Sequence, residues 1–172
     1  MKNFDTRTYN ISDFVEWNEN GLLELSPEFQ RRYVWTEKAK SYLIDTIVRR
    51  KPIPKLLLSQ KLQGKKNVRV VVDGQQRLRT ILGFYNGDFK ISRVHNKEFA
   101  GKTFDDLPED IQEEFLQYEL GVDLLFNMPY EEILDIFARI NSYTVKLKTQ
   151  EIYNARYVGY FKQSIFTYGF KY

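Results

Sequence analysis

The residues best suited to chemistry form the sequence DGQQR, at positions 73–77. The β-branched run Val70 to Val72 precedes them, and an apolar-periodic segment that ends at Asn86-Gly87 follows. This pattern predicts a strand, a tight turn at Asp73-Gly74 and a helix over 75–85. The start of a helix offers backbone N–H groups and the positive end of the helix dipole, an arrangement that suits an anion.

Arg77 is the unusual member of this motif. In the first turn of a helix the dipole favours an acid, and a cation costs about 0.3 kcal/mol or more unless a negative group lies nearby. We interpret this misfit as a phosphate site, cradled by the N–H groups after Gly74 and by the Arg77 guanidinium. Gln75 or Gln76 would orient a water, as glutamine does in other phosphoryl-transfer sites. Asp73 has two open roles, as a Mg²⁺ ligand or as a cap of the helix.

Two further polar clusters interrupt otherwise apolar patterns. The first includes Gln30, Arg31 and Tyr33, in a segment predicted to be an ordered loop. The second is Arg139 with Asn141, near the predicted end of a helix. Each has a structural alternative, because an arginine beside an aromatic ring often covers it with its stem, and an asparagine often ends a helix.

The net charge of +3 conceals two blocks of opposite sign. Residues 31–79 carry 14 basic and three acidic side chains, whereas residues 80–136 carry four basic and 13 acidic ones. Such an asymmetry suggests an anionic partner for the basic half, of which DNA is one candidate, and the alternative is that the two blocks neutralise each other across the fold. The candidate DNA-binding residues are Arg32, Arg49, Arg50, Lys51, Lys65 and Lys66.

Composition narrows the other possibilities. The sequence has no cysteine and one histidine, His95, which argues against disulfides and a structural zinc site. No apolar run approaches the roughly 20 residues of a membrane helix, and the first residues lack the apolar stretch of a signal peptide. The expectation is therefore one intracellular, cytoplasmic domain over residues 1–172.

Periodicity predicts alternating helices and strands around the motif. Ser12 is expected to cap a helix over 13–20, and Thr36 to begin a second one. The remaining predicted elements are strands over 22–25, 55–60, 68–72 and 121–127, a weak strand over 88–94, a turn over 64–67, a helix around 107–116, and helices that begin at Pro129 and at Thr149 or Gln150.

The motif also supports a family resemblance. VVDGQQRLRTIL resembles the DGQQR signature of the GmrSD-type restriction endonuclease N-terminal domain family. FQRRYVW, LIDTIVRRKPIPKLLL and IFARINSYTVKLKTQEIYNA resemble the other recurrent blocks of that family, in the same order. The resemblance covers roughly residues 10–158.

The resemblance implies an α+β fold of the ParB/sulfiredoxin-like type, a small mixed sheet with flanking helices. It further implies binding and hydrolysis of a nucleoside triphosphate (NTP) in a DNA-targeting anti-phage restriction system. We therefore expect a regulatory domain, with NTP and Mg²⁺ as the hypothetical cofactors. The matching positions are Asp73, Gly74, Gln75, Gln76 and Arg77 in the motif, Gln30, Arg31, Tyr33 and Trp35 in the second block, and Arg139 and Asn141 in the third.

The chain departs from the family pattern in one respect. Full-length relatives usually continue into a nicking domain of the His-Asn-His type, and no nuclease site is evident here, so a nuclease domain or subunit is an expected partner. Whether the chain is an enzyme stays open. The alternatives are a DNA-binding module without catalysis, and a partner-binding subunit that uses the aromatic residues 159–172.

Overall fold

A computed structural model describes residues 3–25 and 34–142 of the chain. They belong to two units, Met1–Pro129 and Tyr130–Tyr172. The first unit contains β1 (Phe4–Asn10), α1 (Ile11–Glu19), β2 (Leu23–Glu24), α2 (Glu37–Val48), β3 (Leu56–Gln63), β4 (Lys66–Asp73), α3 (Gln75–Tyr85), α4 (Glu109–Leu116) and β5 (Glu119–Phe126). The described part of the second unit is helical over residues 130–142.

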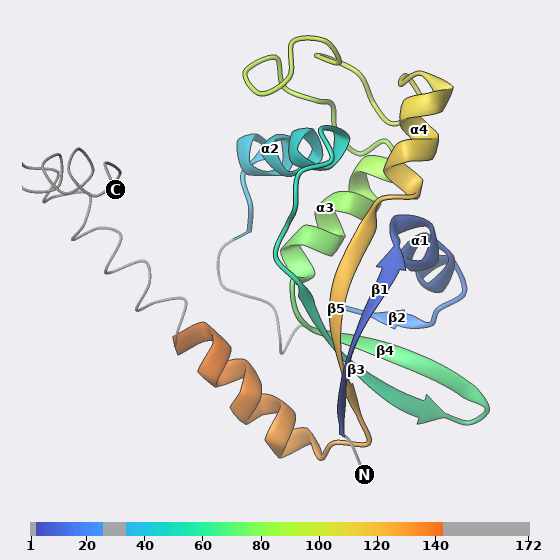
Figure 1. Cartoon of the computed structure of the whole chain (residues 1–172), viewed down its shortest axis with the longest axis vertical. Helices are drawn as coiled ribbons and strands as arrows, with labels where there is room; N and C mark the ends of the chain where they lie inside the picture. The colour runs from blue at the N-terminus through green and yellow to red at the C-terminus, as the bar shows by residue number, and fades with distance from the viewer. Residues whose placement is uncertain (1–2, 26–33, 143–172) are drawn as a thin grey trace, which may run out of the picture. The chain divides into compact units, whose positions relative to one another are not determined.

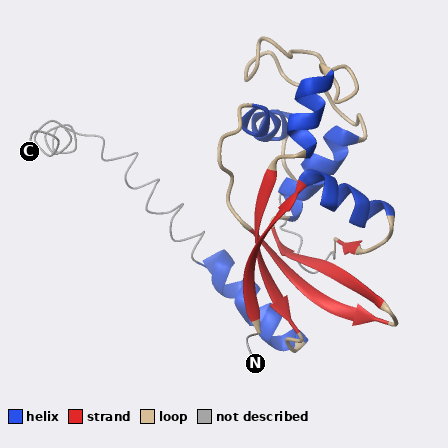
Figure 2. Cartoon of the chain, turned by 45° about the vertical axis from the view of Figure 1, so that its right-hand side comes forward, coloured by secondary structure: helices blue, strands red, loops and turns tan. Residues whose placement is uncertain are grey.

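The five strands form one mixed sheet in the order β1-β5-β3-β4-β2. β1 pairs antiparallel with β5 and β3 pairs antiparallel with β4, whereas the β3–β5 and β2–β4 pairs are parallel. Helices α1 to α4 gather toward one end of the strands, and the β3–β4 hairpin extends away from them (Figures 1 and 2). The α+β class and the small mixed sheet with flanking helices are therefore confirmed.

The hydrophobic core lies between the helices and one face of the sheet. Alternate strand residues such as Leu58, Val71 and Val122 are fully buried and pack with Phe14, Phe84 and other helix residues. Fully burying one such side chain contributes about 1.5–3 kcal/mol. Because successive strand residues point to opposite faces, the buried Val70 and Val72 show that the centre of β4 is apolar on both faces.

Helix α3 has the bounds that its sequence predicts, Gln75–Tyr85. Thr36 also caps α2 as predicted, since its Oγ1 accepts the Ala39 N–H at 3.2 Å. The prediction that Ser12 caps the first helix is wrong. Asn10 is the cap of α1, and its backbone N–H donates to the Asp13 carboxylate at 2.8 Å.

Two segments differ from the predicted elements. The N-terminal strand β1 was not expected, although it pairs with β5 along its whole length. The weak strand predicted over 88–94 is wrong, because this segment belongs to a long loop. The Ser92 N–H donates to the Ser41 hydroxyl at 2.7 Å, and the Ser92 carbonyl accepts from His95 and Asn96 in a turn, so these groups are not available to a sheet. The helix predicted from Thr149 or Gln150 lies outside the described residues.

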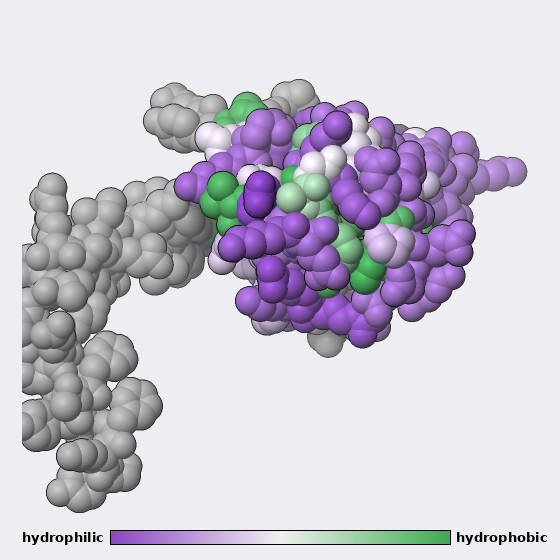
Figure 3. All heavy atoms as spheres, turned by 90° about the horizontal axis from the view of Figure 1, so that it is seen from above, coloured by the Kyte–Doolittle hydropathy of each residue, from purple (hydrophilic) through white to green (hydrophobic). Residues whose placement is uncertain are grey.

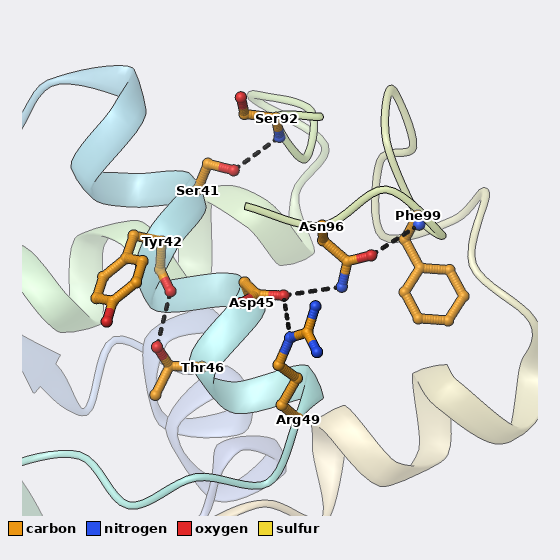
Figure 4. A network of polar contacts seen from close by, with 8 residues as sticks. All are labelled: Ser41, Tyr42, Asp45, Thr46, Arg49, Ser92, Asn96 and Phe99. Atoms are coloured by element: carbon orange, nitrogen blue, oxygen red, sulfur yellow. Dashed lines mark hydrogen bonds and ion pairs between the residues drawn. The ribbon is translucent and has the colours of Figure 1, made fainter. Parts of the chain in front are cut away.

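A polar network fixes this loop on α2 (Figure 4). The buried Asn96 amide donates to Asp45 Oδ1 at 2.9 Å and accepts the Phe99 N–H at 2.9 Å. Arg49 Nε donates to the same Asp45 oxygen at 2.8 Å. The network satisfies polar groups that the core would otherwise leave without partners.

The surface over the helices is mainly hydrophilic. Figure 3 views the first unit from that side and shows only small hydrophobic patches between polar residues. Scattered apolar residues such as Val94, which is 77% exposed, are ordinary features of a folded domain.

Asn96→Ala should lower the free energy of unfolding by about 2–3 kcal/mol, because it removes the partner of two buried polar groups at once. Arg49→Ala should cost no more than about 1 kcal/mol, since its guanidinium is half exposed and Asn96 still serves Asp45. Urea denaturation measures both, with the exposed Lys97→Ala as a control near zero. Equal losses for Asn96→Ala and Arg49→Ala would contradict this description of the network.

Candidate functional site

The turn between β4 and α3 is built around Gly74. Its φ is +98°, a left-handed conformation that side chains rarely adopt, and it is the N-cap residue of α3. A Cβ atom at this position would overlap Leu56 Cδ2 and lie 3.1 Å from Arg77 Nη2. Only glycine fits both the conformation and the space, so the helix begins in direct contact with the first residue of β3.

Arg77 and Asp73 form an ion pair across this turn. Arg77 Nη2 donates to Asp73 Oδ2 at 3.2 Å, and Nη1 donates to the Pro54 carbonyl. Both side chains are largely buried. Asp73 therefore provides the negative charge that a cation in the first turn requires, and the misfit of Arg77 with the helix dipole is resolved within the protein. The misfit alone no longer argues for a phosphate.

The segment that presents the Pro54 carbonyl is itself held in place. The Tyr118 hydroxyl donates to the Lys51 carbonyl at 2.6 Å, just before β3. Burial raises the pKa of the Tyr118 hydroxyl, which keeps it protonated as a donor. The segment that contacts the motif is thus tied, through Tyr118, to the connection between α4 and β5.

The two glutamines point their polar groups to different partners. Gln75 is buried, and its Nε2 donates to the Val71 carbonyl at 3.1 Å, in β4 two residues before the motif begins. Gln76 Oε1 accepts the Trp35 N–H at 3.3 Å. Gln76 Nε2 is buried and has no hydrogen-bond partner among the residues that the structure describes. An unpartnered buried donor costs roughly 1–3 kcal/mol unless it serves another purpose.

Helix α3 also contacts both ends of the segment that carries the second polar cluster. Arg79 Nη2 lies 3.5 Å from the Leu25 carbonyl, and Gln76 binds the Trp35 backbone. Gln30, Arg31, Arg32 and Tyr33 themselves lie outside the described residues. The structure therefore places the described ends of this block at the motif, and the roles of these four residues stay predictions.

The third block belongs to the second unit. Arg139 lies on its helix and pairs with Asp135 at 2.7 Å, one helical turn away. Asn141 lies near the last described residue of the same helix. The two units are described separately, so a role for Arg139 or Asn141 beside the DGQQR turn stays a prediction.

The candidate DNA-binding residues divide into two groups. Arg49 pairs with Asp45 at 2.8 Å and Arg50 with Glu114 at 2.8 Å. Arg50 also has a φ of +55° and ends α2 in a Schellman arrangement, with its N–H on Ile47 and the Lys51 N–H on Thr46. These contacts give Arg49 and Arg50 structural partners, and the Arg50–Glu114 pair joins the basic block to the acidic one.

Lys65 and Lys66 lie elsewhere, at the tip of the β3–β4 hairpin. The eight residues of β3 separate them from Lys51, which corresponds to about 23 Å of extended chain. The structure does not gather the five described residues of this set into one patch.

Within the described ranges, no group of three or more His, Asp or Glu side chains could hold a metal ion. The same part of the chain contains no helix that is long and apolar enough to cross a membrane. Asp73 is the carboxylate of the DGQQR motif and the predicted Mg²⁺ ligand. It already accepts a hydrogen bond from Arg77.

Comparison with known families now gives the class of this domain. A strand–glycine–helix turn that carries DGQQR lies in a small α+β domain, and residues 11–158 match the family described as GmrSD restriction endonuclease, N-terminal domain. The chain belongs to this family and is a module of a restriction or defence system. No curated protein and no solved structure is found to match it.

Sequence reasoning missed two features of the site. The Pro54 carbonyl, 23 residues from Arg77, accepts a hydrogen bond from the Arg77 guanidinium. A backbone acceptor cannot be predicted from the type of residue that carries it. The link from Trp35 to Gln76 spans 41 residues. The recurrent family blocks could have indicated both contacts, because three of these blocks supply residues to this turn: the block with Trp35, the block with Pro54 and the motif itself.

Gly74→Ala should destabilise the domain far more than Gly87→Ala. Both residues have positive φ, +98° and +81°, but a Cβ at Gly87 meets nothing within 4 Å. We expect a loss of about 1–2 kcal/mol at Gly87 and roughly 1–3 kcal/mol more at Gly74, where the new methyl group overlaps Leu56. Urea unfolding of the two variants checks the difference, and similar losses would show that the turn has room to adjust.

Proposed function

We propose that the chain binds a nucleoside triphosphate at the turn between β4 and α3, and that binding regulates a restriction system. The observation that carries the proposal is Gln76 Nε2, in the first turn of α3, which is buried and has no hydrogen-bond partner among the described residues; Gln76 follows the left-handed Gly74 by two positions. A helix start supplies N–H donors and a positive dipole end. The first turn of α3 contains no acid that would repel an anion.

Arg77 has a positioning role in this proposal. Its contacts with Asp73 and Pro54 hold the guanidinium at the turn, so no side-chain entropy is lost when a phosphate arrives. Arg31, from the neighbouring block, would add a second positive charge. Arg77 thus keeps its predicted phosphate-binding role, although its ion pair with Asp73 also has a structural use.

The proposed cofactor is Mg²⁺ with the nucleotide. Mg²⁺ keeps several waters and is commonly bound through one or two carboxylates together with substrate phosphates, so a large cluster of protein ligands is not required. Asp73 is the carboxylate that would contribute. The chemistry that the metal supplies is neutralisation of phosphate charge.

Hydrolysis is a separate proposal with its own assignment. Gln75 Nε2 is engaged with the Val71 carbonyl, whereas Gln76 retains an unpartnered donor, so Gln76 is the better candidate to orient a water. The measurement is phosphate release from each NTP by the 172-residue chain, in the presence of Mg²⁺. Release that Gln76→Glu abolishes supports an enzyme, and tight binding without release restricts the function to sensing.

The partners that we propose are the nucleotide, DNA as the target of the restriction system, and a nuclease domain or subunit. The family description supports a module of a restriction endonuclease. We place this function in the cytoplasm, where NTP and invading DNA are both present.

MgATP, MgGTP, MgCTP and MgUTP should be tested by thermal unfolding. At a concentration about 100-fold above Kd, the matching nucleotide should add about 2.7 kcal/mol of stability, or roughly 5–10 °C in Tm for a domain of this size. Gln76→Glu keeps an acceptor for the Trp35 N–H but removes the amide donor and adds negative charge, so it should abolish the shift.

Lys90→Ala is the matched control for this experiment. Lys90 is a basic, exposed residue outside the three sequence blocks of the proposed site, so its removal should leave the nucleotide shift unchanged. Each shift is taken relative to the same variant without nucleotide, which corrects for any change in basal stability. The absence of a shift with all four nucleotides, or an undiminished shift in Gln76→Glu, contradicts the proposed site.

A further inference from the structure

The tip of the β3–β4 hairpin is a two-stranded ribbon that continues beyond the sheet. β3 pairs with β5 only as far as Gln60, and β4 meets β2 only from Arg69 onward. Residues 61–63 and 66–68 pair with each other alone within the described strands. Figures 1 and 2 show the hairpin extending away from all four helices of the unit.

The dimensions of this ribbon match the major groove of B-DNA. From Gln60 to Gln63 the strand advances three residues, or about 10 Å, beyond the last contact with β5. The groove is about 8.5 Å deep and about 12 Å wide, and it admits a two-stranded β-ribbon. The tip can therefore reach the groove floor before the body of the sheet meets the backbone.

The turn at the tip is short and well defined. Gln63 pairs with Lys66, so Gly64 and Lys65 are its two central residues. Gly64 has a φ of +60°, while Lys65 does not have a positive φ, a combination typical of a type II′ hairpin turn. A two-residue turn of this kind keeps the tip narrow and limits the conformational entropy lost on binding.

The charge of the tip is uniformly positive. No Asp or Glu occurs between Asp45 and Asp73 in the sequence. Lys65 and Lys66 are exposed and have no ion pair with any described residue, whereas Lys61 pairs with Glu24 at 2.9 Å. Unlike Arg49 and Arg50, these two lysines have no described structural use, so their charge is available to phosphate groups.

The side chains around the lysines suit contact with base edges. Leu62 is 68% exposed, so its side chain is accessible to a partner. It pairs across the ribbon with Asn67, and Gln63 lies beside it. An apolar group can contact the thymine methyl, and amide side chains can bond adenine in the major groove.

We propose that the β3–β4 tip is a double-stranded DNA contact that enters the major groove, with Lys65 and Lys66 on the phosphates and Leu62 and Asn67 toward the base edges. The proposal rests on the proposed DNA partner, and it is independent of the nucleotide site because β4 separates the tip from the DGQQR turn. The sequence already predicts that Lys65 and Lys66 contact DNA. The new part of the proposal is that they do so at the tip of a two-stranded ribbon.

The experiment measures binding of the 172-residue chain to a 20-base-pair duplex by fluorescence anisotropy between 50 and 200 mM salt. Each phosphate contact contributes about 0.9 to the slope of log K against log salt. Lys65→Ala with Lys66→Ala should lower the slope by about 2 and weaken binding about tenfold or more. The exposed pair Lys90→Ala with Lys97→Ala is the control with the same loss of charge, and its affinity should stay within about twofold of wild type.

Groove entry has a second readout. A duplex methylated at guanine N7, which lies in the major groove, should bind the wild-type chain several-fold more weakly. A single strand of the same sequence should bind less tightly than the duplex. Equal affinity for methylated and unmethylated duplex, or preference for the single strand, overturns groove entry.

The outcomes also separate this proposal from the others. If the Lys65/Lys66 variant binds the duplex as tightly as the wild type, the proposed ribbon contact is wrong, whereas the proposed DNA partner is still supported. No duplex binding at any salt overturns both. An unchanged Tm of the variant without nucleotide shows that the domain is folded and that a loss of DNA binding arises at the tip.

Discussion

The close packing of Gly74 against Leu56 is the constraint on which the site depends. It brings the start of α3 against β3 and leaves no room for a side chain, so the sheet and the helix meet at a fixed position. Arg77 can then reach both Asp73 and the Pro54 carbonyl, and Gln76 can reach the Trp35 backbone. Three segments that are distant in the sequence are thereby joined at one turn.

The charge pattern of the sequence has two physical explanations in the structure. Part of the basic block is neutralised locally or by the acidic block, as the Arg49–Asp45 and Arg50–Glu114 pairs show. The remainder includes the hairpin tip, where Lys65 and Lys66 project without described acidic partners. β4 runs from Lys66 at this tip to Asp73 at the motif, so one strand connects the two proposed binding sites.

Local patterns in the sequence predicted the elements that depend on local forces. The bounds of α3 follow from Asp73-Gly74 at one end and Asn86-Gly87 at the other, and the hairpin follows from its glycine turn. β1 could not be predicted in this way, because its residues gain stability only from pairing with β5, more than 100 residues later. The Pro54 carbonyl could not be predicted as an acceptor of Arg77 for the same reason, because it lies 23 residues away. The misfit of Arg77 with the helix dipole indicated a nearby negative charge, and Asp73, four residues away, supplies it.

The most direct test of the nucleotide site is an NMR titration of the ¹⁵N-labelled chain with inorganic tripolyphosphate and then with MgATP and MgGTP. Tripolyphosphate carries no base, so it reports the phosphate site alone. We expect the largest amide shifts at Gly74 to Leu78, with a change at the Gln76 side-chain amide, because these donors would face the anion. Shifts confined to other parts of the chain, or no saturable shift with any of the three ligands, would contradict the proposed site.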